Sequence, residues 1–356
     1  MTANSPQSAN ATHRPPTIDA SWLDRHTEPV IEPDRVIIDP HHHLWARETQ
    51  NYMQSEALAD FSSGHRIVAT VFVECWSGYR TTGPDHLRAV GETEFVTRLA
   101  GPVRIGQQTC NFVAGIVGHA DLTSVDVLDE VLSAHIEAGN GRFRGIRHAV
   151  QFDATGSIPV VRKSAPGLLV DPAFQRGVAR LAHHGLSFDA WLYQTQLDEL
   201  VACARSAPDT SIVLNHLGGP LAIAAYAGRS DELSRQWTRS LAELARCANV
   251  TVKLGGLGMA TAGHGFHAQQ VAPTSEAMAN AFRAQVLAAI DLFGPNRCMF
   301  ESNFPVDKIS GSYAVLWNAF KRLASSFSAD EKDALFRRTA ARVYRLDTPA
   351  PKEHSS

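Results

Sequence analysis

Two histidines separated by one residue are the clearest chemical signal in the chain. His41, His42 and His43 follow a short apolar run. Because side chains alternate between the two faces of an extended chain, His41 and His43 point the same way and His42 points the other way. Two imidazoles on one face can bind one metal ion, whereas a hydrogen-bonded polar cluster or a solvated loop is the structural alternative. We predict that His41 and His43 are metal ligands and that His42 is not.

A fourth histidine, His216, follows another apolar run and precedes a Gly-Gly-Pro break. A histidine in this place is suited to metal binding or to proton transfer. The alternative is a core histidine that is hydrogen-bonded to a carbonyl group. Together with His41 and His43, we predict His216 as a third metal ligand and a catalytic residue.

Further polar side chains lie within or just after apolar runs. Glu74 and Asp189 are candidates for the site, because a charge in a buried strand is costly unless it is paired or bound to a metal. Arg147 is suited to bidentate binding of a substrate carboxylate, or it forms an ion pair with Glu74 or Asp189. His148 beside it is a further candidate for substrate binding. Trp76 is predicted to form an aromatic wall of the substrate pocket, with core packing as its alternative.

Eight apolar runs alternate with longer amphipathic segments and must position these residues. The runs lie at residues 36–39, 67–74, 112–118, 143–149, 186–191, 211–214, 250–254 and 298–300. Helical patterns occupy residues 125–137, 171–184, 194–205, 231–247, 275–293 and 313–324, and Ser328 opens another helix with Glu331 as its capping-box partner. This alternation is typical of an α/β fold of the (β/α)₈ TIM barrel type. A doubly wound sheet is the alternative, but it requires a glycine-rich turn where this chain has Pro40 and the histidines.

The predicted barrel spans residues 34–347, between a flexible leader at residues 1–33 and a tail at residues 348–356. Both end segments are polar and contain prolines without a helical or strand period. Residues 258–275 form a long loop after the seventh run, which is typical of a lid or a binding loop. His264 and His267 in this loop either contact the substrate or are solvated.

The composition excludes several classes of function. The chain has 356 residues, a formal net charge of −3 and 16 histidines. This charge balance provides no basic field for nucleic acid or a membrane surface, and no apolar run reaches the ~18 residues of a membrane span. The five cysteines are far apart and form no C-x-x-C pair, which disfavours a disulfide framework. We expect a cytoplasmic protein with a small-molecule substrate, as a monomer or a homo-oligomer.

The motifs together resemble the amidohydrolase-related TIM-barrel hydrolases, in particular the lactonase-like branch with pyrone-dicarboxylate lactonase and sulfomuconolactone hydrolase. The resemblance covers residues 36–346 and rests on the H-x-H pair, "GIVGHADL" at 115–122, "FRGIRHA" at 143–149, "LNHLGGP" at 214–220 and "ESNFPVD" at 301–307. It implies a hydrolase that acts on a small anionic lactone or a related acyl bond.

One position departs from the pattern of this family. The relatives carry an aspartate at the end of the last strand that binds metal or acts as general base, whereas this chain has Asn303. Asparagine can hold a water molecule but cannot accept its proton. Glu301 lies two positions earlier on the same face of the strand, ~6.6 Å lower. We predict that the catalytic carboxylate has moved to Glu301; the alternative is an ion pair with an arginine below the site. Asp307 is expected to cap a turn or to pair near Lys308.

These expectations combine into one mechanism. A divalent metal, expected to be Zn²⁺, is held by His41, His43 and His216 with an open position for water. Glu301 is the general base and Arg147 orients the substrate. The sequence offers no obvious histidine or lysine from the middle strands for a second metal. The alternatives are a metal-free mechanism in which the histidines polarise the carbonyl, a metal-dependent non-oxidative decarboxylase, and a barrel that binds a ligand without turnover.

Overall fold

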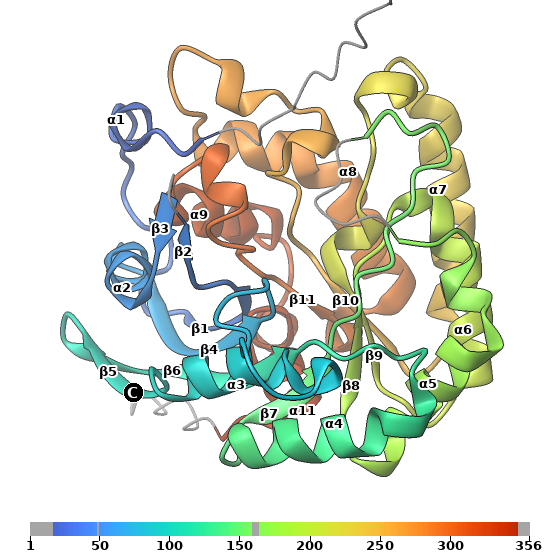
Figure 1. Ribbon diagram of the computed structural model, residues 1–356. Coiled ribbons are helices and arrows are strands. Elements are labelled where there is room, and N and C mark those ends of the chain that lie inside the picture. Colours follow the sequence, from blue (N-terminus) through green and yellow to red (C-terminus); the bar gives the residue numbers. More distant parts are fainter. Residues whose placement is uncertain (1–16, 48–49, 159–163, 348–356) are drawn as a thin grey trace, which may run out of the picture.

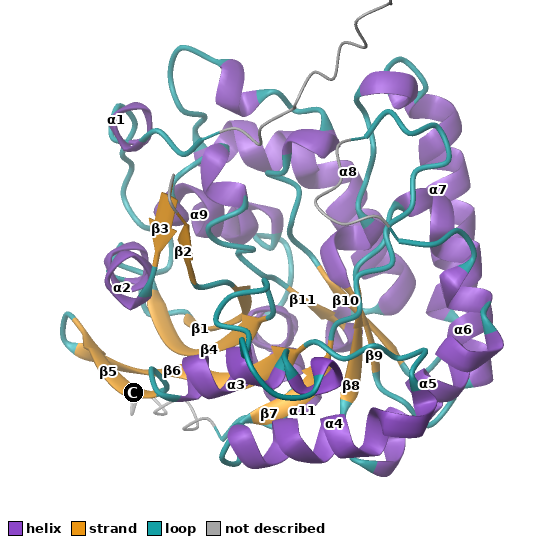
Figure 2. Ribbon diagram, in the orientation of Figure 1, coloured by secondary structure: helices purple, strands orange, loops and turns teal. Residues whose placement is uncertain are grey.

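Eight parallel strands form the inner layer of the protein (Figures 1 and 2). The computed structural model describes residues 17–47, 50–158 and 164–347. The strands are β1 (Val36–His42), β4 (Arg66–Val73), β6 (Gln108–Gly118), β7 (Phe143–Ile146), β8 (Ser187–Ala190), β9 (Ile212–Leu214), β10 (Val250–Lys253) and β11 (Cys298–Met299). Each strand pairs with the next one in this order. The prediction of eight strands in this sequence order is therefore confirmed.

Main-chain hydrogen bonds connect the first strand to the segment that follows the last strand. The His43 amide donates to the Phe304 carbonyl at 2.8 Å, and the Asn303 amide donates to the His41 carbonyl at 3.0 Å. The sheet is therefore nearly closed, which confirms the (β/α)₈ barrel. This closure also brings the two ends of the predicted site, at His41 and Asn303, next to each other.

Helices surround the barrel on its outside (Figure 2). They are α4 (Val125–Ala138), α5 (Pro172–His183), α6 (Leu197–Ser206), α7 (Ser230–Ala245), α8 (Ser275–Phe293) and α9 (Tyr313–Leu323), with α10 (Ala329–Asp333), a π-helical turn (Ala334–Arg338) and α11 (Thr339–Val343) at the end. The predicted capping box is present, because the Glu331 amide donates to Ser328 Oγ and the Ser328 amide donates to the Glu331 carboxylate. None of the helices in the described ranges has the length and apolar character needed to cross a membrane.

The chain also forms smaller elements before and between the barrel strands. They are α1 (Ala20–Leu23), the hairpin of β2 (Trp45–Arg47) and β3 (Gln50–Tyr52), α2 (Gln54–Phe61), α3 (Val90–Thr97) and β5 (Gly101–Ile105), which pairs with β6 in antiparallel fashion. The β2–β3 hairpin directly follows β1, and α3 lies between β4 and β6 in the chain. Both therefore lie close to the ends of strands that carry predicted site residues.

Apolar side chains fill both sides of the strands. One buried cluster combines strand residues with the C-terminal segment and contains Ile38, Val71, Val117, Val213, Met299 and Tyr344. A larger cluster packs the other strand face against the helices. The strands are thus buried on both faces, which explains why they appear in the sequence as continuous apolar runs.

The described part of the predicted leader, residues 17–33, contacts the barrel. Trp22 Nε1 donates to the Gln269 carbonyl at 2.8 Å, and the Glu28 carboxylate accepts from Asn318 Nδ2 at 2.7 Å. Residues 1–16 and the predicted tail at residues 348–356 lie outside the described residues, so the domain boundaries stay a prediction. In the long loop at residues 258–275, His264 stacks against Phe266, whereas His267 is exposed.

Candidate active site

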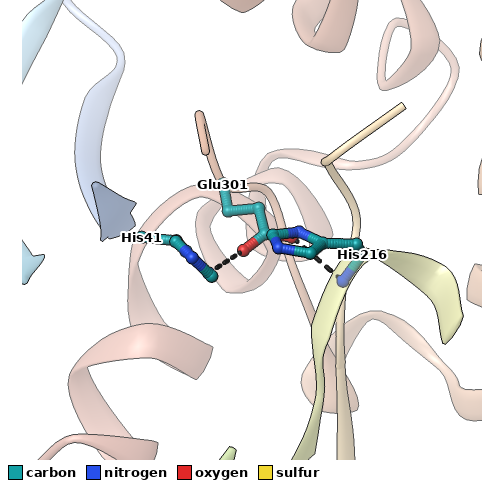
Figure 3. A group of neighbouring side chains, drawn as sticks. All are labelled: His41, His216 and Glu301. Atoms are coloured by element: carbon teal, nitrogen blue, oxygen red, sulfur yellow. Dashed lines mark hydrogen bonds and ion pairs between the residues drawn. The ribbon is translucent and has the colours of Figure 1, made fainter. Parts of the chain in front are cut away.

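His41, His216 and Glu301 meet at the C-terminal end of the barrel (Figure 3). His41 belongs to β1, His216 comes two residues after β9, and Glu301 comes two residues after β11. The Glu301 carboxylate lies between the two imidazoles, with Oε2 2.7 Å from His41 Nδ1 and Oε1 2.7 Å from His216 Nδ1. All three side chains are buried. Three distant segments of the sequence thus form one compact polar group.

Two consecutive glycines after β10 leave room for this group. A Cβ atom on Gly255 would lie 2.4 Å from Glu301 Cγ, and a Cβ atom on Gly256 would lie 2.4 Å from His216 Nδ1. Gly256 also has a φ of +69°, which disfavours any other residue. The close approach of the β10 end to His216 and Glu301 therefore depends on these glycines.

Burial determines the protonation of the group. It lowers the pKa values of His41 and His216 well below the ordinary value, and the nearby Lys253 and Arg147 charges lower them further. Burial also raises the pKa of Glu301 to about 8, an effect that the Lys253 charge opposes. The two imidazoles are therefore neutral at neutral pH, which is the form that binds metal.

The other two histidines of the run point in different directions. His42 Nε2 lies 3.0 Å from Thr70 Oγ1, and its ring packs against Phe61, Phe72 and Phe112. The predicted alternation is thus confirmed. His43 is next to His41, with ring centroids 4.9 Å apart, and its Nδ1 donates to the Val73 carbonyl at 2.7 Å.

A divalent metal fits the donors of His41, His216 and Glu301. One ligand atom from each of them lies within 4.8 Å of the others, and His43 is adjacent to this group without being part of it. Glu301 Oε2 is buried and, within the described ranges, no donor makes an aligned hydrogen bond to it. Because a buried carboxylate oxygen without a partner is costly, a cation at this point would satisfy it. Two imidazoles and a carboxylate are also a common donor set for zinc.

Lys253 is a buried cation that the sequence interpretation missed. Its Nζ lies 2.9 Å from Asp189 Oδ2, 3.2 Å from His41 Nδ1 and 4.0 Å from Glu301 Oε2. Asp189 Oδ2 also accepts from Tyr344 Oη at 2.7 Å and from Asn215 Nδ2 at 3.1 Å. Asp189, predicted as a substrate contact, therefore holds Lys253 against the catalytic group. The single lysine within the apolar run at residues 250–254 is the feature of the sequence that could have identified Lys253 as part of the site.

Arg147 and Glu74 form a buried ion pair at the edge of the site. Arg147 Nε donates to Glu74 Oε1 at 2.7 Å, and Nη1 lies 3.3 Å from His41 Nε2. Arg147 Nη2 also donates to the Glu74 carbonyl. The ion-pair alternative from the sequence thus describes this arginine, and its third contact orients the His41 ring.

Asn303 and Asp307 interact with each other in the segment that follows the last strand. Asn303 Nδ2 donates to Asp307 Oδ1 at 2.8 Å, and the Gly258 amide donates to Asp307 Oδ2 at 2.8 Å. Of the two alternatives for Asp307, the structure has the contact with a main-chain amide and not a pair near Lys308, whose Nζ binds Asp60 at 2.7 Å. Burial raises the pKa of Asp307 to about 8. Asp307 is therefore a second buried carboxylate near the catalytic group.

A pocket of about 390 Å³ opens at the ends of β4, β6 and β7. Its wall includes Trp76 and His148, as predicted for substrate contacts, and also His119, Asp121 and Thr123. His119 Nδ1 donates to the Arg147 carbonyl at 3.1 Å, so its neutral ring presents Nε2 as an acceptor. The "GHAD" segment of the sequence carries His119 and Asp121 but was not interpreted as part of the site.

Glu92 of α3 holds the loop that follows β4. Its Oε1 accepts from the Cys75 amide at 2.9 Å and from the Ser77 amide at 2.7 Å. This loop carries Glu74 and Trp76. Burial, together with the Glu74 charge, raises the pKa of Glu92 to about 8.

The Glu92→Gln substitution is expected to change how stability depends on pH. The pKa of Glu92 in the folded protein is about 8, above its ordinary value of 4.5. The protonated carboxyl therefore contributes its full stability below the ordinary pKa, and this contribution is lost as the pH rises towards about 8. Glutamine keeps an acceptor oxygen but does not titrate. The free energy of unfolding of the wild type, relative to that of the variant, should therefore fall between about pH 5 and about pH 8 in urea denaturation.

The matched control is Glu94→Gln in the same helix. The hydrogen bond from Arg80 lowers the pKa of Glu94, so its titration lies below this pH range. We expect no fall for this control, and a pH-independent difference for Glu92→Gln would contradict the assignment.

Comparison with known proteins identifies the family. Residues 38–346 match the family model described as amidohydrolase. The chain belongs to the amidohydrolase family. The protein is therefore an enzyme of the hydrolase class. The family match also confirms the resemblance found in the sequence.

Three similar proteins place the amidohydrolase more closely. It is 34% identical to an uncharacterized protein of Sinorhizobium fredii over 334 residues, which cover 88% of this chain and 99% of that protein. It is 29% identical to an L-fucono-1,5-lactonase of Burkholderia multivorans over 331 residues, 88% of this chain and 97% of that protein. A crystal structure of an amidohydrolase from Burkholderia multivorans with bound zinc matches this structure with a TM-score of 0.65 and 25% sequence identity. The match covers 88% of this chain and 100% of that chain.

Proposed function

We propose that this amidohydrolase hydrolyses a lactone to the corresponding hydroxy acid. The observation that carries the proposal is the Glu301 carboxylate, held 2.7 Å from both His41 and His216 at the C-terminal end of the barrel. Active sites of this fold lie at that end. The similarity to an L-fucono-1,5-lactonase supports a cyclic ester as the substrate.

His41, His216 and Glu301 would hold a divalent metal, for which Zn²⁺ is our choice. Nitrogen and carboxylate donors suit zinc, and the similar amidohydrolase with bound zinc supports this choice. When bound, the metal would polarise the ester carbonyl and lower the pKa of a water molecule towards ~7. His43, beside His41, is the fourth donor that we propose for this site.

The protein residues perform the proton transfers. Glu301 Oε1 accepts hydrogen bonds from His216 Nδ1 at 2.7 Å and from the His216 amide at 3.2 Å, which fixes the carboxylate. Oε2, which lies 2.7 Å from His41 Nδ1 and beside the proposed cation site, is the oxygen that would take the proton of the attacking water, exchanging its contact with the cation for that proton. The water oxygen bonds to the carbonyl carbon, the ring C–O bond breaks, and the proton passes to the leaving oxygen. The product is one hydroxy acid, so no atom other than those of water is added.

Two ion pairs hold the residues around Glu301 and His41 in place. Lys253, 4.0 Å from Glu301 Oε2, favours the ionised carboxylate that a general base requires. Arg147, which is paired with Glu74, supports the His41 ring at 3.3 Å. We therefore assign Arg147 to positioning of His41 rather than to binding of a substrate carboxylate.

We place the lactone ring in the pocket of about 390 Å³, whose wall contains none of His41, His216 and Glu301. The link to them is His119 in the wall, which contacts the Arg147 carbonyl, while the Arg147 side chain contacts His41. The Leu122 amide donates to His148 Nδ1 at 3.3 Å, so the neutral His148 ring carries its proton on Nε2. His119 and His148 thus offer one acceptor and one donor to ring hydroxyl groups, and Trp76 offers an apolar face. Asn303 supports the site by holding Asp307.

Proton release and product mass test this function. We expect purified protein to release one proton per molecule of L-fucono-1,5-lactone and to give a product heavier by one water. His216→Ala should abolish this activity, whereas the exposed loop variant His267→Ala should retain it. Loss of CO₂ from an aromatic or aliphatic acid would identify a decarboxylase instead, and binding of lactones without turnover would identify a non-catalytic barrel.

A further inference from the structure

The cations at the catalytic group are already paired with acidic residues of the protein. Arg147 binds Glu74 at 2.7 Å, and Lys253 binds Asp189 at 2.9 Å. Among the described residues, the wall of the pocket proposed for the lactone ring adds Asp121 and neither lysine nor arginine. Within the described part of this region, a negatively charged substituent on the substrate therefore has no unpaired cation to bind.

A second pocket, of about 320 Å³, provides such a cation. It lies between the β2–β3 hairpin, the loop after β4 and α3, and its wall includes Arg47, Met53, Trp76 and Phe95. Trp76 also belongs to the wall of the first pocket. The two pockets therefore share one aromatic wall residue, and the second pocket contains an arginine.

A series of ring contacts connects Arg47 to the catalytic group. Its guanidinium carbon lies 4.1 Å from the centroid of the Trp45 ring. The Trp45 ring stacks on His43 at 5.9 Å, and His43 lies 4.9 Å from His41. The Arg47 amide also donates to Asn51 Oδ1 at 3.1 Å within the hairpin. The arginine is therefore positioned beside the site through its aromatic neighbours.

Arg47 also retains its binding capacity. It is exposed, and no acidic side chain in the described ranges forms an ion pair with it. A guanidinium without an acidic partner that lines a pocket is suited to bidentate binding of a carboxylate. The contrast with Arg147, which is fully occupied by Glu74 and His41, distinguishes the two arginines.

We propose that Arg47 and this second pocket bind a carboxylate substituent of the lactone substrate. The lactone ring occupies the first pocket, the carboxylate contacts Arg47, and Trp76, which lines both pockets, borders both parts of the substrate. This inference rests on the proposed lactone hydrolysis. It makes Arg47 a residue that determines specificity and leaves the chemistry at Glu301 unchanged.

Two lactones that differ only in charge test this proposal. D-glucaro-1,4-lactone carries a carboxylate where D-glucono-1,4-lactone carries a CH₂OH group. We expect Arg47→Gln to raise KM for the glucarolactone by about tenfold or more, the value of one charged hydrogen bond, and to leave kcat nearly unchanged. KM for the gluconolactone should stay within about twofold, and Arg47→Lys should recover part of the loss.

Arg104→Gln is the matched control, because Arg104 is an exposed arginine on β5 away from both pocket walls. Equal changes of KM for both lactones, or the same effect from Arg104→Gln, would overturn the proposal. If the wild type hydrolyses neither of these lactones, binding of glucarate is measured by calorimetry; the proposed function itself is contradicted only if L-fucono-1,5-lactone is not hydrolysed either. Binding that Arg47→Gln weakens supports the pocket, and unchanged or absent binding overturns it.

Discussion

Glu301→Gln is expected to lower kcat/KM for lactone hydrolysis by ~10²–10⁴, the usual contribution of a general base. Glutamine has nearly the same shape as glutamate and can still accept the hydrogen bond from the His216 amide, which lies 3.2 Å from Oε1. It cannot take a proton from water. The loss should therefore appear in kcat when the assay contains excess metal, and the melting temperature should remain close to that of the wild type.

Glu301→Asp is the companion variant. Its carboxylate can accept a proton, but it is one methylene shorter and is withdrawn from the two imidazoles. We expect activity between that of the wild type and that of Glu301→Gln. Turnover by Glu301→Gln within about tenfold of the wild-type value would exclude Glu301 as the base.

His41→Ala is expected to abolish both metal retention and turnover. His41 contacts three charged residues of the centre: Glu301 at 2.7 Å, Lys253 at 3.2 Å and Arg147 at 3.3 Å. Its removal takes away one of the four proposed donors, the imidazole that lies beside both His43 and Glu301, so the remaining donors should hold zinc much more weakly. Elemental analysis of protein purified without added metal should give near-stoichiometric metal for the wild type and little for the variant.

His183→Ala serves as the control for the loss of a histidine, because His183 is exposed at the end of α5. It should retain metal and activity. Full activity of the wild type after complete chelation would contradict the metal assignment and favour direct polarisation of the carbonyl by the histidines.

Patterns within short segments predicted the fold and part of the site. The apolar runs gave all eight strands because each strand is buried on both faces. The alternation of side chains in β1 correctly separated His42, which packs among phenylalanines, from His41. The two-residue spacing also led from Asn303 to Glu301, which lies against His41 in the structure.

Contacts between strands could not be predicted from one sequence. In the sequence, Lys253 is a strand residue with no assigned role. In the structure, closure of the barrel places its Nζ 3.2 Å from His41 Nδ1 and 2.9 Å from Asp189 Oδ2. Arg147 had two acidic candidates as partners, and only the pairing of neighbouring strands selects Glu74. The register of a barrel, which no local pattern contains, decides such contacts.

The central claim is that Glu301 is the general base, since Asn303 cannot accept a proton. The buried Asp307 is the alternative general base. Asn303 Nδ2 donates to Asp307 Oδ1 at 2.8 Å, and burial raises the pKa of Asp307 to about 8, as it does for Glu301. The most direct test is kcat/KM for one lactone, measured for Glu301→Gln and Asp307→Asn under identical conditions. The account predicts a loss of ~10²–10⁴ for Glu301→Gln and less than about tenfold for Asp307→Asn. The reverse order would contradict it and assign the base to Asp307.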